Sequence, residues 1–190
     1  MINFAKPTRE QIAQAYGKTV PDLIAPHLNI LFSGINPSLY SAAVGHHFAR
    51  PGNRFWPSLR AAGVTPRLFA PFEGQLLLDA GCGITNVVDR ATATAEELSV
   101  AEMVAGGAAL AEKVRREAPA YVAFLGITAY RSAFGRPRAS VGLQPERLFD
   151  TRIWVLPNPS GLNAHYQVAD LGRLVAELWV ASQASTAASP

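Results

Sequence analysis

The stretch Asn29–Ile35, with the sequence NILFSGI, is an apolar run that ends directly against Asn36 and Pro37. A short continuous apolar run bounded by turn residues is typical of a strand that is buried on both faces. Pro37 lacks an amide hydrogen and disfavours helical backbone at Asn36, so the strand must end there. The runs Tyr121–Ile127 (YVAFLGI) and Ile153–Leu156 (IWVL) are of the same kind.

Helical patterns separate these buried strands. Capping boxes predict helices over residues 8–17 and 99–117, and residues 54–62 form a further helical segment before Gly63. A fourth, short strand is predicted at 76–79. Each of the two longest helical patterns has an apolar stripe that is expected to be buried. In the helix over 99–117 the stripe is Val100, Met103, Val104, Gly107, Ala108, Ala111 and Val114. In the last helix it is Val168, Leu171, Leu174, Val175 and Leu178. Buried strands that alternate with helices predict a mostly parallel sheet covered on both faces.

The composition is that of one ordinary domain. The chain has 190 residues, 49% of them hydrophobic, which predicts a single domain over residues 1–180 and a disordered tail over 181–190. Cys82 is the only cysteine, which excludes an internal disulfide, a four-cysteine zinc site and a cysteine-ligated iron–sulfur cluster. No run approaches the roughly 20 apolar residues of a membrane span, and no signal peptide is evident. We therefore expect a cytoplasmic protein of bacterial type that has no membrane partner.

The charge pattern permits a nucleic-acid partner. The chain has 17 basic and 14 acidic residues, a net charge of +3, and its basic residues are 14 Arg and only 3 Lys. Arginine grips phosphate through a planar fork, whereas lysine is a point charge. A GC-rich genome would favour arginine equally well, so the charge alone does not identify the ligand.

Three loops follow the carboxyl ends of predicted strands, at Asn36–Asn53, Gly81–Asn86 and Pro157–Asn163. Ligands of open α/β sheets bind beyond these ends. The loops are rich in asparagine, which offers an acceptor and two donors but is neither an acid nor a base. The sequence has no phosphate-binding glycine loop, dinucleotide fingerprint or nucleophile elbow, and the adjacent pair His46-His47 lacks metal-ligand spacing. No cofactor and no metal are therefore predicted.

Motifs in these loops resemble those of a known enzyme family. They are Gly34-Ile-Asn-Pro-Ser38, Gly45-His-His-Phe48, Pro51-Gly-Asn-Arg-Phe-Trp56, Cys82-Gly-Ile-Thr-Asn-Val-Val-Asp-Arg90 and Leu156-Pro-Asn-Pro-Ser-Gly-Leu162. Their order and spacing resemble the mismatch-specific uracil-DNA and thymine-DNA glycosylases, within the uracil-DNA glycosylase superfamily. The resemblance implies a three-layer α/β/α sandwich with a small, mostly parallel four-stranded sheet. It also implies hydrolysis of the N-glycosidic bond of uracil, or a related base, flipped out of DNA.

The resemblance implies roles for individual residues. Asn36 matches the residue that orients the attacking water, and Phe48 the aromatic residue that stacks on the flipped base. A core phenylalanine is the competing interpretation of Phe48. Ser41 matches the position that faces the pyrimidine C5, where a hydroxyl would crowd a thymine methyl. Asn86 matches an amide that reads the pyrimidine edge. The remaining residues expected at the base pocket are Ile35 and Asn158, and Asn158 is also a candidate for loop shaping alone.

The loop after the last strand is expected to enter the DNA. Gly161 and Leu162 match the wedge that fills the space left by the flipped base, together with Ser160 and Asn163, and a buried loop leucine is the competing interpretation. Some relatives carry a serine and an arginine after the wedge, where this chain has Asn163 and Ala164. Preference for guanine opposite the lesion is therefore an open question, as is preference for duplex over single-stranded DNA.

Several alternatives follow from the same residues. Asp79 or Asp89 is a minority candidate for assisting the water, against the alternative that Asp89 pairs with Arg90 or caps a backbone amide. Strand cleavage is not expected, because it needs an amine nucleophile and none of the motifs contains lysine. The expected protein is a monomer that acts on uracil-containing DNA without a cofactor. The competing functions are a nucleoside hydrolase and a damaged-base binding module without turnover.

Overall fold

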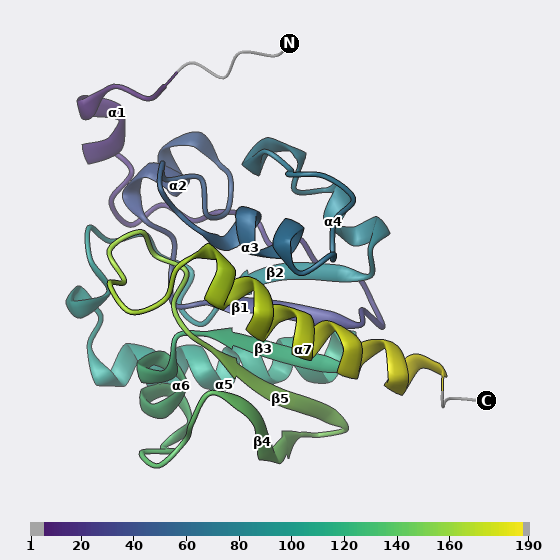
Figure 1. Ribbon diagram of the computed structural model, residues 1–190. Helices are drawn as coiled ribbons and strands as arrows, with labels where there is room; N and C mark the ends of the chain where they lie inside the picture. The colour runs from purple at the N-terminus through teal and green to yellow at the C-terminus, as the bar shows by residue number, and fades with distance from the viewer. Residues whose placement is uncertain (1–5, 188–190) are drawn as a thin grey trace.

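The computed structural model describes residues 6–187, which form a five-stranded sheet between two layers of helices (Figure 1). The strands lie in the order β2-β1-β3-β5-β4. Their bounds are β1 Ile30–Gly34, β2 Cys82–Asn86, β3 Tyr121–Leu125, β4 Gly142–Leu148 and β5 Thr151–Leu156. The α-helices are α1 Arg9–Ala13, α2 Leu39–Val44, α3 Phe55–Ala61, α4 Leu76–Asp79, α5 Val100–Glu117, α6 Ile127–Phe134 and α7 Val168–Ala187, and the 3₁₀ turns are η1 Pro71–Glu73 and η2 Ala95–Glu97.

Three parallel pairings place the carboxyl ends of four strands at one edge of the sheet. Strand β1 pairs in parallel with β2 and with β3, and β3 pairs in parallel with β5. Every residue of β1, β2 and β3 is buried, as expected for parallel strands that are covered on both faces. In this register Gly34 lies opposite Asn86, so the loops that follow β1 and β2 begin side by side.

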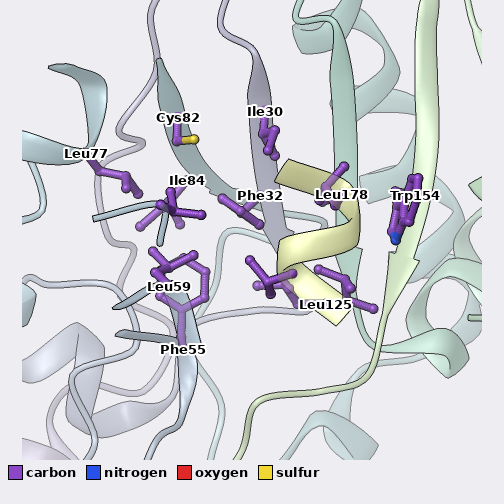
Figure 2. Close-up of a cluster of buried hydrophobic side chains, with 14 of the residues drawn as sticks. Ile30, Phe32, Phe55, Leu59, Leu77, Cys82, Ile84, Leu125, Trp154 and Leu178 are labelled. Carbon is purple, nitrogen blue, oxygen red and sulfur yellow. The ribbon is translucent and has the colours of Figure 1, made fainter. Parts of the chain in front are cut away.

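Alternation along β1 divides the interior into two cores. Ile30 and Phe32 face α3 and α7, where they pack with Phe55, Leu59 and Leu178 (Figure 2). Leu31 faces the opposite side, which is covered by α5 and α6 and belongs to a second cluster. Figure 1 shows α7 crossing one face of the sheet and α5 and α6 lying behind the other. The helices and strands thus form the predicted α/β/α layers.

The prediction for residues 76–86 is wrong in both parts. Leu76–Asp79 forms helix α4, and the predicted loop Gly81–Asn86 contains strand β2. Glycine inside a strand usually indicates a turn, a bulge or a close approach of backbone, and at Gly83 the last applies. A Cβ there would lie 2.5 Å from the carbonyl oxygen of Leu23, which pairs with β2 at Ile84.

The sheet has five strands, whereas four were expected. The additional strand β4 lies at the edge and runs antiparallel to β5, with an irregularity between Leu143 and Arg147. Its sequence, GLQPERL, is polar and contains Pro145, which cannot donate to a ladder and is typical only of edges. Such a strand has no buried apolar run by which the sequence could reveal it.

Two helical predictions are also corrected. The loop predicted over residues 38–53 contains helix α2, which begins at the N-cap Ser38 and ends at Gly45 in left-handed backbone. In α5 the buried face is Met103, Gly107, Leu110 and Val114, whereas Val100 and Val104 of the predicted stripe are 71% and 51% exposed. Gly107 is common to the predicted and the observed stripe, and α6 packs closely against it, since a Cβ there would lie 2.7 Å from the Ala133 carbonyl oxygen.

The end of the chain is helical further than predicted. Helix α7 continues to Ala187, so residues 181–187 are not a tail, and 188–190 lie outside the described residues. Ser182 is buried on this extension and donates to the Trp179 carbonyl oxygen. Over residues 6–187, no helix combines the length and the apolar character needed to cross a membrane.

Candidate active site

A cavity of about 430 Å³ opens at the carboxyl edge of the sheet. Its walls come from the segments after β1, β2 and β5. The segments after β1 and β5 are loops that the sequence predicted, whereas the predicted loop Gly81–Asn86 is strand β2 itself and the lining residues 92–96 follow it. The predicted site residues that line it are Ile35, Asn36, Ser41, Phe48, Asn86, Asn158, Ser160, Leu162 and Asn163. Residues more than 120 positions apart in sequence therefore meet in one pocket because four parallel strands end there.

The side-chain amide of Asn36 is held in one orientation. Its Nδ2 donates to the Arg90 carbonyl oxygen at 3.0 Å and to Thr92 Oγ1 at 2.7 Å. A carbonyl oxygen can only accept, so the atom facing Arg90 must be the nitrogen. Thr92 Oγ1 in turn donates to the Thr94 carbonyl oxygen, which leaves its lone pairs for Asn36. Both amide hydrogens are therefore used, and Oδ1 remains as the acceptor that Asn36 can offer to a water.

Asn86 offers an amide to the interior of the cavity. The residue is only 4% exposed, yet its side chain has no hydrogen-bond partner among residues 6–187. Gly34, its register partner, makes room for it, because a Cβ there would lie 2.5 Å from Asn86 Oδ1. An amide that opens onto the cavity and has no partner among the described residues is suited to a ligand that brings both a donor and an acceptor.

Phe48 forms an aromatic wall of the cavity. Its ring stacks on Phe55, with centroids 4.2 Å apart and an angle of 28° between the planes, and lies close to Gly34. The backbone of Phe48 has φ +53°, a left-handed conformation that costs an L-residue about 1–2 kcal/mol. Hydrogen bonds on both sides maintain it: Trp56 Nε1 donates to the His47 carbonyl oxygen, and the Ala49 amide donates to Ser41 Oγ.

Ser41 and His47 support this turn from beneath. Ser41 is 3% exposed, and its hydroxyl also accepts a hydrogen bond from Ser38 Oγ, so it links helix α2 to the Phe48 turn. His47 is buried, and its Nε2 donates to the Pro21 carbonyl oxygen at 2.9 Å. Burial lowers the pKa of His47, which keeps the ring neutral at physiological pH.

The loop over residues 158–163 stands at the mouth of the cavity. Leu162 is 77% exposed, so the competing interpretation of a buried loop leucine is wrong. Asn158 Oδ1 accepts from the Ser160 amide at 2.9 Å, and Asn163 Nδ2 donates to the Asn158 carbonyl oxygen at 2.9 Å. Asn158 therefore shapes the loop as well as lining the cavity. Gly161 does not line the cavity but packs on Gly52, where a Cβ would lie 2.6 Å from the Gly52 carbonyl oxygen.

The two carboxylates considered in the sequence lie elsewhere. Asp79 precedes β2, at the opposite end of that strand from the cavity. The Asp89 side chain is 65% exposed, lies 3.8 Å from Lys113 Nζ and does not line the cavity. Neither carboxylate lines the cavity, so the structure gives no support to the expectation that one of them assists the attacking water. It contradicts a pair between Asp89 and Arg90, because Arg90 binds Glu102 instead.

The charged and polar residues around the cavity include several that the sequence did not indicate. Of the described residues that line it, Glu96 is the one carboxylate, and it is exposed. No group of His, Cys, Asp and Glu side chains within residues 6–187 could hold a metal ion. Three residues that position the loops, Arg54, Arg90 and Thr92, have no role that is evident from the sequence pattern. Arg54 lies within the motif Pro51-Gly-Asn-Arg-Phe-Trp56, whereas Thr92 becomes evident only through its contact with Asn36.

The comparisons with known proteins agree with this geometry. The model of the uracil DNA glycosylase superfamily matches residues 21–180, and the chain belongs to that superfamily. A solution NMR structure from Methanosarcina acetivorans, provisionally assigned as a uracil DNA glycosylase, has a similar fold with a TM-score of 0.55. The two chains share 16% sequence identity, over 86% of this chain and 98% of the other, so this likeness supports the fold alone. Membership in the superfamily makes the protein a glycosidic-bond hydrolase of DNA repair.

Proposed function

We propose that this protein is a mismatch-specific, monofunctional glycosylase that removes uracil flipped out of DNA and leaves an abasic site. The observation that carries the proposal is the pairing of a flat aromatic wall with a free amide in one cavity. Phe48 provides a face on which a ring can stack, and Asn86 provides a donor and an acceptor beside it. The edge of uracil presents carbonyl oxygens and an imide hydrogen, which are complementary to such an amide.

The fixed amide of Asn36 supports a dissociative reaction. Asparagine cannot take a proton, so the glycosidic bond must break with the base leaving as an anion and the sugar becoming cationic. The proton that the water loses when it bonds to C1′ then passes to the solvent or to the departed uracil anion. Asn36 Oδ1 would then accept a hydrogen bond from the water that captures C1′, because its Nδ2 is occupied by Arg90 and Thr92. Catalysis would depend on hydrogen bonds to the departing base, and a slow enzyme is expected.

The positions of the lysines support the absence of strand cleavage. A glycosylase that also cuts DNA needs an amine nucleophile that forms a Schiff base. Lys113 Nζ binds Asp22 Oδ2 at 2.6 Å and Thr85 Oγ1 at 2.9 Å, and neither it nor Lys6 or Lys18 lines the cavity. Hydrolysis should therefore stop at the abasic site.

A glycosylase assay with labelled oligonucleotides tests the proposal. The substrates carry uracil, thymine, hypoxanthine or ethenocytosine, either single-stranded or opposite each of the four bases, and alkali then cleaves any abasic site. We expect alkali-dependent product from uracil, and a loss of about 100-fold or more in the Asn36→Ala variant. Product without alkali would contradict the monofunctional assignment. Full activity of Asn36→Ala would contradict the proposed reaction.

The same assay separates the competing functions. Release of uracil from uridine but not from oligonucleotides would select a nucleoside hydrolase. Tight binding to a uracil duplex without any abasic product would select a binding module. Comparison of G·U with A·U and single-stranded uracil decides the mismatch preference, and size-exclusion chromatography with light scattering checks that the active species is a monomer.

A further inference from the structure

The guanidinium of Arg54 is bound to three carbonyl oxygens of the loop over residues 158–163. Nη1 donates to the Asn163 carbonyl at 2.7 Å and to the Ser160 carbonyl at 3.1 Å, and Nη2 donates to the Gly161 carbonyl at 3.4 Å. The backbone amide of Arg54 adds a bond to the Pro159 carbonyl at 2.8 Å. Charge-assisted bonds from a planar fork fix direction as well as distance, which lysine could not reproduce.

Among the described residues, the hydrogen bonds that tie the loop to the body of the protein come from Arg54, and burial of Pro159 adds packing at its start. Its internal bonds join Asn158, Ser160, Leu162 and Asn163 to one another and define a local turn. Outside that turn, Gly161 packs on Gly52. Leu162 itself is 77% exposed, so packing of its own side chain does not orient it. The direction in which Leu162 projects therefore depends on the contacts made by Arg54.

We infer that Arg54 is a positioning residue that preorganises Leu162 for insertion into duplex DNA, and this rests on the proposed function. A wedge that is already ordered avoids the entropy cost of fixing the loop when DNA binds. Leu162 assists only while the base is being extruded from a stack, since an unpaired base needs no wedge. Arg54 does not line the cavity, so its removal leaves Asn36, Phe48 and Asn86 in place.

Arg50 provides a matched control. It is an exposed arginine two residues before Gly52, lines the cavity mouth, and its side chain makes no hydrogen bond among the described residues. Substituting Arg50 or Arg54 by methionine removes one positive charge from the same short segment of the chain. Only Arg54→Met also removes the bonds to the loop. A difference between the two variants therefore reports on loop positioning rather than on electrostatic attraction for phosphate.

The experiment compares full-length wild type, Arg54→Met, Arg54→Lys and Arg50→Met under single-turnover conditions. One substrate holds uracil paired in a duplex, and the other holds uracil unpaired in an internal loop of the same duplex. For Arg54→Met we expect roughly a tenfold lower rate on the paired substrate and less than about a twofold change on the unpaired one. Arg54→Lys should show the same selective loss, and Arg50→Met should change both substrates by similar factors.

Extrusion is also measured directly, without base release. The Asn36→Ala variant is mixed with a duplex that carries 2-aminopurine beside the uracil, and the fluorescence of 2-aminopurine should rise when Leu162 unstacks the bases. The double variant Asn36→Ala/Arg54→Met should give a smaller rise at saturating protein. Equal losses on both substrates, no loss on either, or an unchanged rise in fluorescence would overturn the inference. Thermal melting shows whether each variant is folded. If Arg54→Met does not fold, the comparison of paired and unpaired substrates is made with Arg54→Lys instead. If the proposed function itself fails, wild type releases no uracil from either substrate, which distinguishes the two failures.

Discussion

Thr92 Oγ1 accepts a hydrogen bond from Asn36 Nδ2 at 2.7 Å, although the two residues are 56 positions apart in sequence. The segment that carries Thr92 is itself anchored, because the Arg90 side chain binds Glu102 at the start of α5, the Tyr16 hydroxyl and the Glu97 carbonyl oxygen. The orientation of the Asn36 amide, which is proposed to bind the water, therefore depends on the segment 90–92, and the Glu102 side chain in the N-terminal cap of α5 holds that segment through Arg90.

Replacement of Thr92 by valine should slow base release while leaving DNA binding intact. Valine keeps the shape of threonine but cannot accept from Asn36, so the amide can turn away from the water. Because small displacements of reacting groups are costly, we expect roughly a 10- to 100-fold lower single-turnover rate with an unchanged Kd. Thr92→Ser restores the hydroxyl and should recover most of the rate; equal defects in both variants would argue against this role.

Leu162→Ala should impair activity on duplex DNA without destabilising the fold. A side chain that is 77% exposed contributes little packing, so Tm should change by no more than about 2 °C. The rate on uracil paired in a duplex should fall by about tenfold, because the stack is no longer wedged open. Melting curves and single-turnover rates check this together. A large drop in Tm with a normal rate would assign Leu162 to structure instead.

Gly34→Ala should disable the Asn86 amide. The new Cβ would lie 2.5 Å from Asn86 Oδ1 and 3.3 Å from Phe48 Cζ, so the amide must move away from the aromatic wall. We expect inhibition by free uracil to weaken by roughly tenfold, and Asn86→Ala to weaken it similarly. A double-mutant cycle provides the control: the two effects should not add, since they remove the same contact. Additive losses would show that Gly34 acts elsewhere.

Ser41→Ala should both loosen the Phe48 turn and relax the choice of base. The substitution leaves the Ala49 amide without its acceptor, which costs about 1–3 kcal/mol and lowers Tm. It also removes the hydroxyl that is expected to crowd a thymine methyl, so the rate on G·T relative to G·U should rise. Parallel rate measurements on the two duplexes check this. A wild-type enzyme that already cleaves G·T faster than G·U would contradict the assignment.

His47 should make stability fall as the pH drops below about 6.5. Burial lowers the pKa of His47 in the folded protein, whereas the unfolded chain takes up a proton near pH 6.5. Between these values the unfolded state binds more protons, so acid favours unfolding. Melting temperatures from pH 8 to pH 5 measure the effect. His47→Gln keeps a donor for Pro21 but does not titrate, and its melting curve should depend less on pH over this range.

Local sequence was sufficient for the buried parallel strands and the capped helices. The strands over 30–34, 121–125 and 151–156 contain short apolar runs that are typical of buried strands, and the Ser99 cap marks the start of α5. The motifs at the ends of β1 and β5 also located the cavity, because the carboxyl ends of parallel strands must meet. Strand β4 and the short helix α4 have no such pattern, and they were missed or mistaken.

The tertiary structure alone decided which groups are free and which are engaged. Sequence shows five asparagines in the loops, but only the folded chain shows that Asn36 is anchored at Nδ2, that Asn86 is unpartnered and that Asn158 closes a turn. The contacts of Thr92 and Arg54 have the same origin. Hydrogen-bond partners that lie more than 50 positions apart produce no periodic pattern in a single sequence. Burial of a strand, in contrast, requires apolar residues within the strand itself and is therefore visible locally.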